Sequence, residues 1–374
     1  MKRVSKDNNK KTPKVRFPGF NDDWEEKKCK DIAPLQRGFD LPVSNMIEGK
    51  YPVVMSNGIR VYHNEYKVKG PGVITGRSGT IGKLQYIDTD YWPHNTSLWV
   101  TDFKGNYPKF VFYLYQKLNL SKFGTGSGVP TLNRNDVHDT LIHIPSHDEQ
   151  KKISMCLDNL DHLITLHQRK LEKLKEYKKG MLQKMFPKNG EKVPEVRFPG
   201  FDGEWKERKV SELCSISTGK SNTQDKVEDG KYPFYVRSPI IERSTKYLYD
   251  EEAVITVGDG VGTGKVFHYV NGKYDLHQRC YRMYGFSDEL NAHYFYHTFS
   301  KLFYKRVMSM TAKTSVDSVR LEMISDMKIP VPDIEEQRKI GSFLDNLDRL
   351  IAIQQKKIES LKEFKKGCLQ QMFV

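Results

Sequence analysis

The apolar residues between Ser146 and Phe186 fall alternately four and three positions apart. This spacing is a heptad seam, and it predicts a long helix that packs against another helix. The stretch from Asp333 to Phe373 repeats the seam at an offset of 187 residues. We expect the two helices to pair with each other, because both copies present the same seam. The predicted pairing residues are Ile153, Leu157, Leu160, Ile164, His167, Leu171 and Leu174 in the first copy, and Ile340, Leu344, Leu347, Ile351, Gln354, Ile358 and Leu361 in the second.

Two details of the helices repeat as well. The seam becomes polar at His167 and at Gln354, and a polar seam residue usually fixes the register of a helix pair. Each helix is preceded by Ser146 or Asp333, with a glutamate three residues later, Glu149 or Glu336. This arrangement predicts an N-cap closed by a capping box.

The segments that precede the helices are related to each other more loosely. `VRFPGF` begins at Val15 and again at Val196, and `GKYP` begins at Gly49 and at Gly230, both at an offset of 181. Short β-type runs and one helical run in each segment predict a mixed α/β (α+β) domain. Trp24 and Trp205, repeated in the same frame, are most simply core anchors. A scaffold that is repeated while its loops differ indicates two different recognition surfaces.

The predicted organisation follows the repeat. We expect a disordered basic tail at 1–14, a first recognition domain at 15–145, a first spacer helix at 146–186, a linker at 187–195, a second recognition domain at 196–332 and a second spacer helix at 333–374.

The net charge of +14 indicates a polyanionic partner, and nucleic acid is the commonest one. Part of this charge lies in the tail, where residues 2–14 hold six Lys/Arg and one acidic residue. No apolar run approaches the roughly 20 residues that span a bilayer, so we expect a soluble intracellular protein without a membrane partner. Five scattered cysteines without a CxxC pair predict neither disulfides nor a metal site, and we expect no cofactor bound by this chain.

Motifs for catalysis are weak. `DGVGTGKV`, Asp259 to Val266, differs at two positions from a phosphate-binding loop, and `RSGTIGKL`, Arg77 to Leu84, differs at the same two. The glycines are expected to form tight turns that present polar residues at the surface. A nuclease motif at Glu149 and Lys151 conflicts with the helix, and no NPPY or HExxH motif is present.

His94 and His277 occupy matching places before a predicted strand, and two roles stay open for them. Each is a structural histidine, or part of a loop that contacts bases. The candidate DNA-binding residues are Arg37, Asn57, Arg77, Ser78, Lys83, His94, Asn95, Thr96 and Ser127 in the first domain, and Lys220, Arg237, Ser238, Asp259, Lys265, His277, Gln278, Lys313 and Thr314 in the second.

The chain resembles the specificity (S) subunit of type I restriction-modification systems. The resemblance rests on `LQRGFDLP`, `GVITGRSGTIGK`, `GSGVPTLNRNDV`, `IPSHDEQKKI`, `IPVPDIEEQRKI` and the `LDNLD` helices, duplicated in the same order. It implies a non-catalytic, DNA-binding subunit with two target-recognition domains, separated by an antiparallel coiled coil of two helices with pseudo-two-fold symmetry. The second domain lacks `RSG` and `PTLNR`, so its contacts do not follow from those of the first.

The resemblance also implies partners. They are double-stranded DNA, two adenine methyltransferase (modification) subunits and motor-nuclease (restriction) subunits, in the cytoplasm of a bacterium that uses the complex for DNA methylation and host defence. S-adenosylmethionine, ATP and Mg²⁺ are implied for the partner subunits only.

Helix length supports a split target independently of the resemblance. A helix of 41 residues is about 60 Å long at roughly 1.5 Å per residue, and domains at its two ends can reach grooves about one DNA turn apart. We therefore expect a bipartite asymmetric target. The alternatives are the DNA-reading subunit of a related fused nuclease-methyltransferase system, an enzyme that acts alone, and a coiled-coil scaffold without a DNA role.

Overall fold

The computed structural model describes residues 11–126, 128–188, 190–260, 262–310 and 318–374. The chain divides into two compact units, Met1–Gln168 with Lys356–Val374 (unit 1) and Arg169–Gln355 (unit 2). Both division points lie inside the long helices α4 (His147–Lys184) and α8 (Ile334–Gln371). Each unit therefore contains one recognition domain, part of its own helix and part of the helix of the other repeat.

Unit 1 contains mixed helix and sheet. Among its described residues, strands form a four-stranded sheet of order β2-β8-β5-β6, a three-stranded sheet of order β4-β3-β7, and the pairs β1-β11 and β9-β10. The strands are β1 (Glu25–Lys28), β2 (Leu35–Arg37), β3 (Glu48–Met55), β4 (Gly58–His63), β5 (Gly72–Gly76), β6 (Leu84–Ile87), β7 (Trp92–Pro93), β8 (Ser97–Val100), β9 (Gly124–Thr125), β10 (Thr131–Leu132) and β11 (Leu141–Ile144). The helices before α4 are α1 (Cys29–Ile32), η1 (Val43–Asn45), α2 (Pro108–Leu118), η2 (Leu120–Phe123) and α3 (Arg134–His138).

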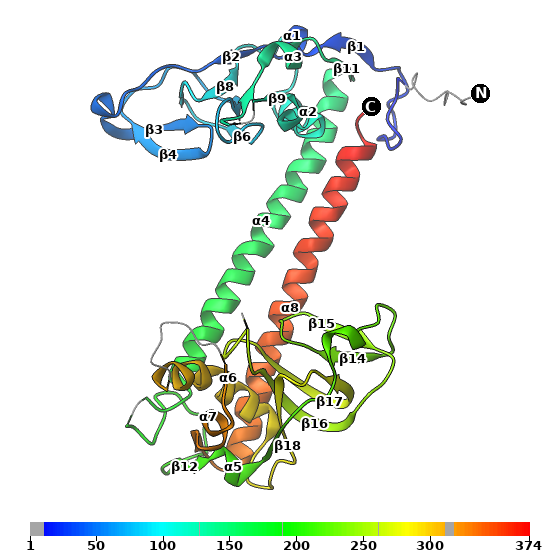
Figure 1. Ribbon diagram of the computed structural model, residues 1–374. Helices are drawn as coiled ribbons and strands as arrows, with labels where there is room; N and C mark the ends of the chain where they lie inside the picture. The colour runs from blue at the N-terminus through cyan, green and yellow to red at the C-terminus, as the bar shows by residue number, and fades with distance from the viewer. Residues whose placement is uncertain (1–10, 127, 189, 261, 311–317) are drawn as a thin grey trace, which may run out of the picture. The chain divides into compact units, whose positions relative to one another are not determined.

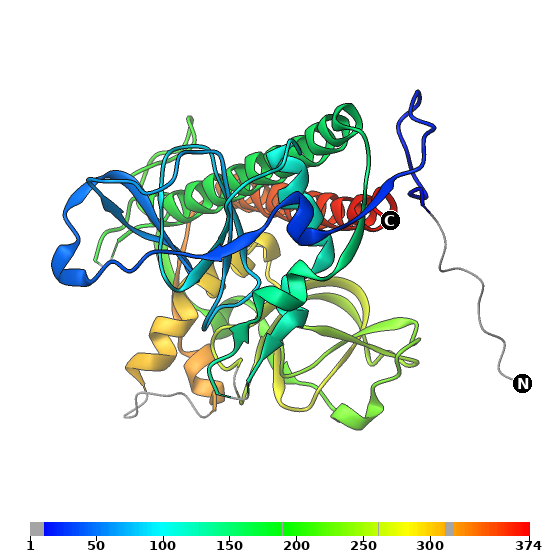
Figure 2. The same cartoon turned by 90° about the horizontal axis from the view of Figure 1, so that it is seen from above.

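Unit 2 uses the same plan with two longer strands, and its recognition domain is drawn from green to orange in Figures 1 and 2. Among its described residues, the main sheet has six strands in the order β13-β18-β16-β17-β14-β15, and β12 pairs with β19. The strands are β12 (Lys206–Lys209), β13 (Ser215–Thr218), β14 (Tyr232–Tyr235), β15 (Ile241–Ser244), β16 (Tyr249–Val257), β17 (Phe267–Leu276), β18 (Cys280–Tyr284) and β19 (Lys328–Val331). The helices are α5 (Val210–Leu213), η3 (Thr223–Asp225), α6 (Ala292–Ser309) and α7 (Leu321–Ser325).

The local sequence explains these elements. β5 reads `GVITG` and is buried along its whole length, as expected for a short apolar run in the middle of a sheet. α2 has Pro108 at its first turn, where the missing N–H is not needed. α6 begins at Ala292, directly after Asn291, whose side chain accepts the N–H of Tyr294 as an N-cap.

The repeated `GKYP` motif has a steric cause. A Cβ atom added at Gly49 would lie 2.3 Å from the backbone of Asn64, and one added at Gly230 would lie 2.5 Å from that of Ser244. No side chain fits at either place, so both repeats need glycine. The tyrosine of the motif packs against a second ring in the same way in each unit, because Tyr51 and Tyr66, like Tyr232 and Tyr247, have centroids 4.9 Å apart and planes tilted by 59°.

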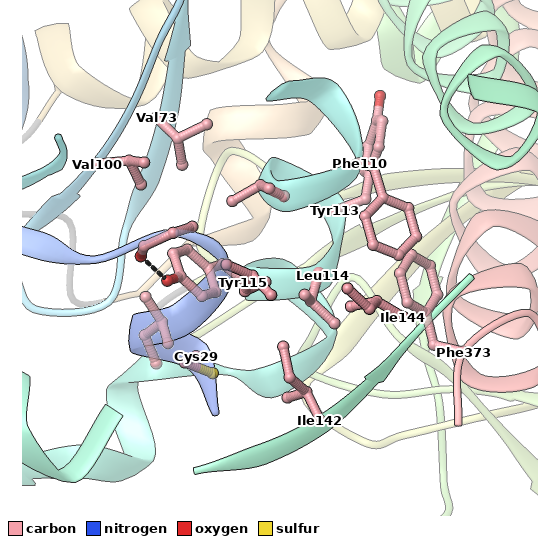
Figure 3. Packing of buried hydrophobic residues seen from close by; sticks show 14 of the residues in the cluster. Cys29, Val73, Val100, Phe110, Tyr113, Leu114, Tyr115, Ile142, Ile144 and Phe373 are labelled. Carbon is pink, nitrogen blue, oxygen red and sulfur yellow. Dashed lines mark hydrogen bonds between the residues drawn. The ribbon is translucent and has the colours of Figure 1, made fainter. Parts of the chain in front are cut away.

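The core of unit 1 lies between α2, the sheet and the helix ends (Figure 3). Trp24 packs edge-on against Phe110, and Phe110 stacks on Phe373 with centroids 5.4 Å apart. The hydroxyl of the buried Tyr115 donates a hydrogen bond to the carbonyl oxygen of Ala33. The last residues of the second repeat therefore complete the core of the first domain.

The core of unit 2 repeats this arrangement with the other helix end. Phe186, which follows α4, packs edge-on against Trp205 at 6.1 Å and stacks on Tyr294 at 5.8 Å. The backbone N–H of Val196 donates to the carbonyl oxygen of Lys184, as that of Val15 does to Gln371. The two tryptophans are buried core residues in both units.

Within each unit, α4 and α8 lie side by side and run antiparallel (Figure 1). In unit 1, Lys365 of α8 donates to both carboxylate oxygens of Asp161 at 2.7 Å. In unit 2, Lys178 of α4 donates to Asp348, the matching aspartate of the second repeat. The predicted seam residues are buried, apart from His167, Leu174, Ile351 and Leu361, which are half-buried.

The helix starts match the expected capping box only in part: the side chain of Asp333 accepts the N–H of Glu335 at 2.8 Å as an N-cap, but the glutamates have other partners. Glu149 is buried and receives two hydrogen bonds from Arg16, at 2.7 and 2.8 Å, and Glu336 receives the same pair from Arg197. The glutamates therefore bind the arginine of the repeated `VRFPGF` segment. Sequence spacing alone does not reveal a partner that lies 133 positions away.

Candidate nucleic-acid interface

In unit 1, the loops at one end of the sheet join into a continuous surface. The N–H of Gly38, after β2, donates to the oxygen of Ser97, and the N–H of Arg77, after β5, donates to that of Thr96. The N–H of Leu132 then donates to Arg77 at 2.7 Å. These bonds bring Arg37, Arg77, Ser78, His94, Asn95 and Thr96 together, although they are spread over 60 residues of sequence.

A pocket of about 450 Å³ opens on this surface and is lined by three arginines, Arg37, Arg77 and Arg134. Its other lining residues are Leu98, Thr125, Thr131, Leu132, Asn133 and Asn135. Asn133 caps α3 by accepting the N–H of Asn135 at 3.1 Å, which places Arg134 at the first turn of that helix. Three cations beside amide and hydroxyl groups suit phosphate oxygens or the O6 and N7 atoms of guanine.

Arg134 and its neighbours were absent from our candidate residues. They belong to `GSGVPTLNRNDV`, a motif that carries the resemblance, so the sequence did contain a signal for them. The pairing of β10 with the loop after β5 brings this motif beside Arg77, through a bridge between Ser78 and Thr131.

Asp40 lies at the rim of the same surface. One of its carboxylate oxygens accepts hydrogen bonds from Arg37, at 3.2 Å, and from Asn95. The aspartate side chain is 69% exposed and the arginine 52%, so this ion pair is worth little in stability. Lys83 and Asn57 form a further exposed contact, in which Lys83 Nζ donates to the backbone oxygen of Asn57 at 3.1 Å.

The equivalent loops of unit 2 join through equivalent bonds. The N–H of Lys220 donates to the oxygen of Leu276, and that of His277 donates to Tyr235. The N–H of Gly258 donates to Arg279 at 2.8 Å. Lys220, Arg237, Asp259 and Gln278 therefore lie close together over the buried His277, and Arg279, which the candidate residues omitted, lies among them.

Charge is arranged differently on this second surface. Asp259 lies between two arginines, with one oxygen 3.3 Å from Arg237 and the other 3.8 Å from Arg279. The matching residue in unit 1 is Ser78, and the residue that matches Arg77 is Gly258. The two surfaces thus share a backbone plan and differ in the side chains that they present.

The two matching histidines have the same contact. The ring Nδ1 of His277 accepts the N–H of Arg279 at 3.0 Å, and that of His94 accepts the N–H of Thr96 at 3.4 Å. Burial lowers the pKa of both rings, and Arg237 lowers that of His277 further. The geometry favours the structural role, in which each neutral ring holds the loop that carries the candidate residues.

The remaining candidates lie apart from these clusters or outside the described residues. Ser238 bonds within its own turn, to Ile240, and Lys265 lies over the ring of Tyr304 on α6 at 5.0 Å. Ser127, Lys313 and Thr314 lie outside the described residues.

The described part of the chain contains no group of three or more His, Cys, Asp or Glu side chains placed to hold a metal ion. Burial raises the pKa of the thiols of Cys29, Cys214 and Cys280 to about 12, which leaves them protonated and unreactive at neutral pH. In the same described residues, no helix combines the length and the apolar character that crossing a membrane requires.

Two mixed α/β domains with different basic loop surfaces, each followed by the same long helix, define a class of modular proteins with a duplicated scaffold. A family model described as "Type I restriction modification DNA specificity domain" matches residues 21–176 and 202–363, and the chain belongs to that family. Specificity subunits of this kind are non-catalytic by themselves, so the chain is not an enzyme on its own.

The relatives agree over almost the full length. The specificity subunit of the type I restriction enzyme MjaVIII from Methanocaldococcus jannaschii is 24% identical over 98% of this chain and 95% of its own. The MjaIX specificity subunit of the same organism is 23% identical over 93% of this chain and 92% of its own.

The crystal structure of the type I restriction-modification S subunit from M. genitalium has the same fold. It superposes with a TM-score of 0.76 at 16% identity, over 97% of this chain and 99% of that one.

Proposed function

We propose that this chain reads a bipartite, asymmetric DNA target, with one half read by each recognition domain and an unread spacer between the halves. The observation that carries the proposal is the contrast between the two loop surfaces. Ser78 and Arg77 of the first surface correspond to Asp259 and Gly258 of the second. Two surfaces of different chemistry on one repeated plan are suited to two different half-sites.

The domain limits predicted above set the test. Residues 196–332 are exchanged for the second recognition domain of a relative, and the methylated motif of cells that carry the chimera is determined. We expect one half of the target to change while the other half and the spacer stay the same. A change in both halves, or a single continuous target in the parent protein, contradicts the proposal.

In the first domain, the three pocket arginines contact base edges and phosphates of the DNA. If Arg77 makes a bidentate contact to a guanine, Arg77→Ala should weaken the binding free energy for the true target by about 1 to 3 kcal/mol. The loss should be smaller for a duplex in which that guanine is already replaced. Lys30→Ala, which removes an exposed charge outside the pocket, should lower affinity for both duplexes equally and slightly. An equal loss on both duplexes for Arg77→Ala would make it a phosphate contact.

We further propose that the long helices dock two copies of one methyltransferase subunit, to which motor-nuclease subunits are added, in the bacterial cytoplasm. Each helix carries exposed apolar residues at matching places, outside the pairing seam. They are Leu163 and Leu166 on α4 in unit 1, and Leu350 and Ile353 on α8 in unit 2, and each is between 40% and 54% exposed. Residues at this spacing form a second apolar stripe, which suits a partner helix.

Because the stripe occurs twice, the two docking sites should be equal. Leu163→Asp should remove one methyltransferase subunit from the complex purified with its own system's subunits, and Leu163→Asp with Leu350→Asp should remove both. Gln168→Asp, an exposed polar site on the same helix, is the matched control. Mass measurement of the intact complex checks the stoichiometry, and full assembly by the double variant would contradict docking at the stripe.

A further inference from the structure

The second recognition surface contains a carboxylate that two arginines enclose, here called the Asp259 clamp (Arg237, Asp259, Arg279). Asp259 has one oxygen 3.3 Å from a terminal nitrogen of Arg237 and the other 3.8 Å from Nε of Arg279. The aspartate side chain is 21% exposed, whereas those of the arginines are 47% and 65% exposed. The carboxylate is therefore recessed, and the guanidinium groups are at the surface.

The backbone holds all three members in place. The N–H of Gly258 donates to the oxygen of Arg279, and the N–H of Val319 donates to that of Gly258 at 2.6 Å. The ring Nδ1 of the buried His277 accepts the N–H of Arg279. The backbone N–H of His277 donates to the carbonyl oxygen of Tyr235, which ends β14 two residues before Arg237. The clamp thus joins the ends of three strands, and its side chains start from fixed positions.

The chemistry of the clamp favours base reading over phosphate binding. One carboxylate oxygen of Asp259 accepts a hydrogen bond from Arg237 at 3.3 Å, and the other lies at ion-pair distance, 3.8 Å, from Nε of Arg279, so each oxygen faces an arginine. An arginine whose orientation is fixed can present two parallel N–H groups, which match the O6 and N7 atoms of guanine. The aspartate also reduces the charge of the clamp from two to one, which weakens attraction to phosphate in general.

The first domain offers a comparison. At the position that matches Asp259 it has Ser78, and its own rim carboxylate, Asp40, is exposed and comes from a different loop. We propose that Asp259 is a positioning residue that sets the base preference of the second domain, by orienting Arg237 and Arg279 toward guanine edges. This inference rests on the proposed function.

The test compares full-length variants on a pool of randomised duplex DNA, and the sequences that each variant enriches are read. Asp259→Asn keeps the shape of the side chain but releases the arginines. We expect its preference at the guanine positions of the second half-target to fall by at least about fivefold, while the first half-target is unchanged and affinity for the unselected pool is equal or higher. Asp259→Glu should recover part of the preference, and Asp40→Asn, the matched charge change, should leave the second half-target unchanged.

The outcomes separate three cases. If Asp259→Asn lowers affinity for the whole pool without changing the enriched sequence, or changes neither, the positioning role is wrong. If Arg279→Lys, which keeps the charge but loses the fork, leaves the second half-target unchanged, the clamp does not read guanine. If the parent protein enriches no sequence at all, the proposed function itself fails, which the other two results would not imply.

Discussion

At the scale of single residues, each of the two matching histidines holds its loop through a hydrogen bond to the loop backbone. His94 and His277 each accept the N–H of the residue two positions on, and in the second domain that residue is Arg279. Since only the neutral ring can accept this bond, the loops depend on unprotonated imidazoles. The clearest consequence is a dependence of stability on pH.

Burial lowers the pKa of His277 below its ordinary value of 6.5, and it also lowers those of His94, His138 and His268. The unfolded chain therefore binds more protons than the folded chain in mildly acidic solution. The stability that the neutral rings contribute is fully present above pH 6.5 and is lost as the pH falls below it. Thermal unfolding should show a lower midpoint at about pH 5.5 than at about pH 7.5.

The variant His277→Asn should make this difference smaller, because asparagine does not titrate. His162→Asn, at an exposed site on α4, should leave the difference unchanged. A pH dependence that is the same in the parent and in His277→Asn would show that His277 is not held neutral by burial.

At the scale of elements, each long helix is tied at its start to its own recognition domain. Arg16 joins the `VRFPGF` segment to Glu149 at the first turn of α4, and Arg197 joins the second copy to Glu336 on α8. Buried glutamines add a second tie, because Gln150 bonds the backbone of Tyr107 and Gln337 that of Asn291. These contacts fix each domain on the start of its helix.

Glu336→Gln should lower the free energy of unfolding by about 2 to 3 kcal/mol, because it leaves the Arg197 side chain, which is only 15% exposed, without a counter-charge. The control is Glu335→Gln, one position before Glu336, which breaks an exposed ion pair with Arg338. It should lower the free energy of unfolding by less than about 1 kcal/mol. Urea titration of the two variants measures the difference. Equal costs would mean that the Arg197 pair acts like a surface pair.

At the scale of the whole molecule, each unit needs residues from both repeats. Phe373, at the end of the second helix, packs on Trp24 and Phe110 in unit 1, and Phe186 packs on Trp205 and Tyr294 in unit 2. The two recognition domains are thus not independent of the long helices that follow them. Each is completed by the helix end of its counterpart.

Phe373→Ala should destabilise unit 1 by about 3 to 5 kcal/mol, because a large buried ring is removed, and Phe186→Ala should do the same to unit 2. Amide hydrogen exchange can separate the two effects. Exchange should become faster in β1 and α2 for Phe373→Ala, and in β12 and α6 for Phe186→Ala. Equal acceleration in both units for either variant would contradict the division into units.

The sequence by itself determined the features that depend on local spacing and on repetition. The heptad seam predicted the long helices from Ile153 onward, and the double motif order predicted the duplicated α/β plan, since both are properties of neighbouring or equivalent positions. Most of the candidate residues of the first domain, such as Arg37 and Arg77, also come together, because strand ends of one sheet meet at one edge.

Only the tertiary structure decided which distant side chains meet. It brought Arg134 beside Arg77, enclosed Asp259 between Arg237 and Arg279, paired Glu149 with Arg16 and placed Phe373 on Trp24. The partners in these contacts lie far apart in sequence, and their approach depends on the path of the whole chain. Periodicity specifies which face of an element is buried, whereas packing specifies what that face touches.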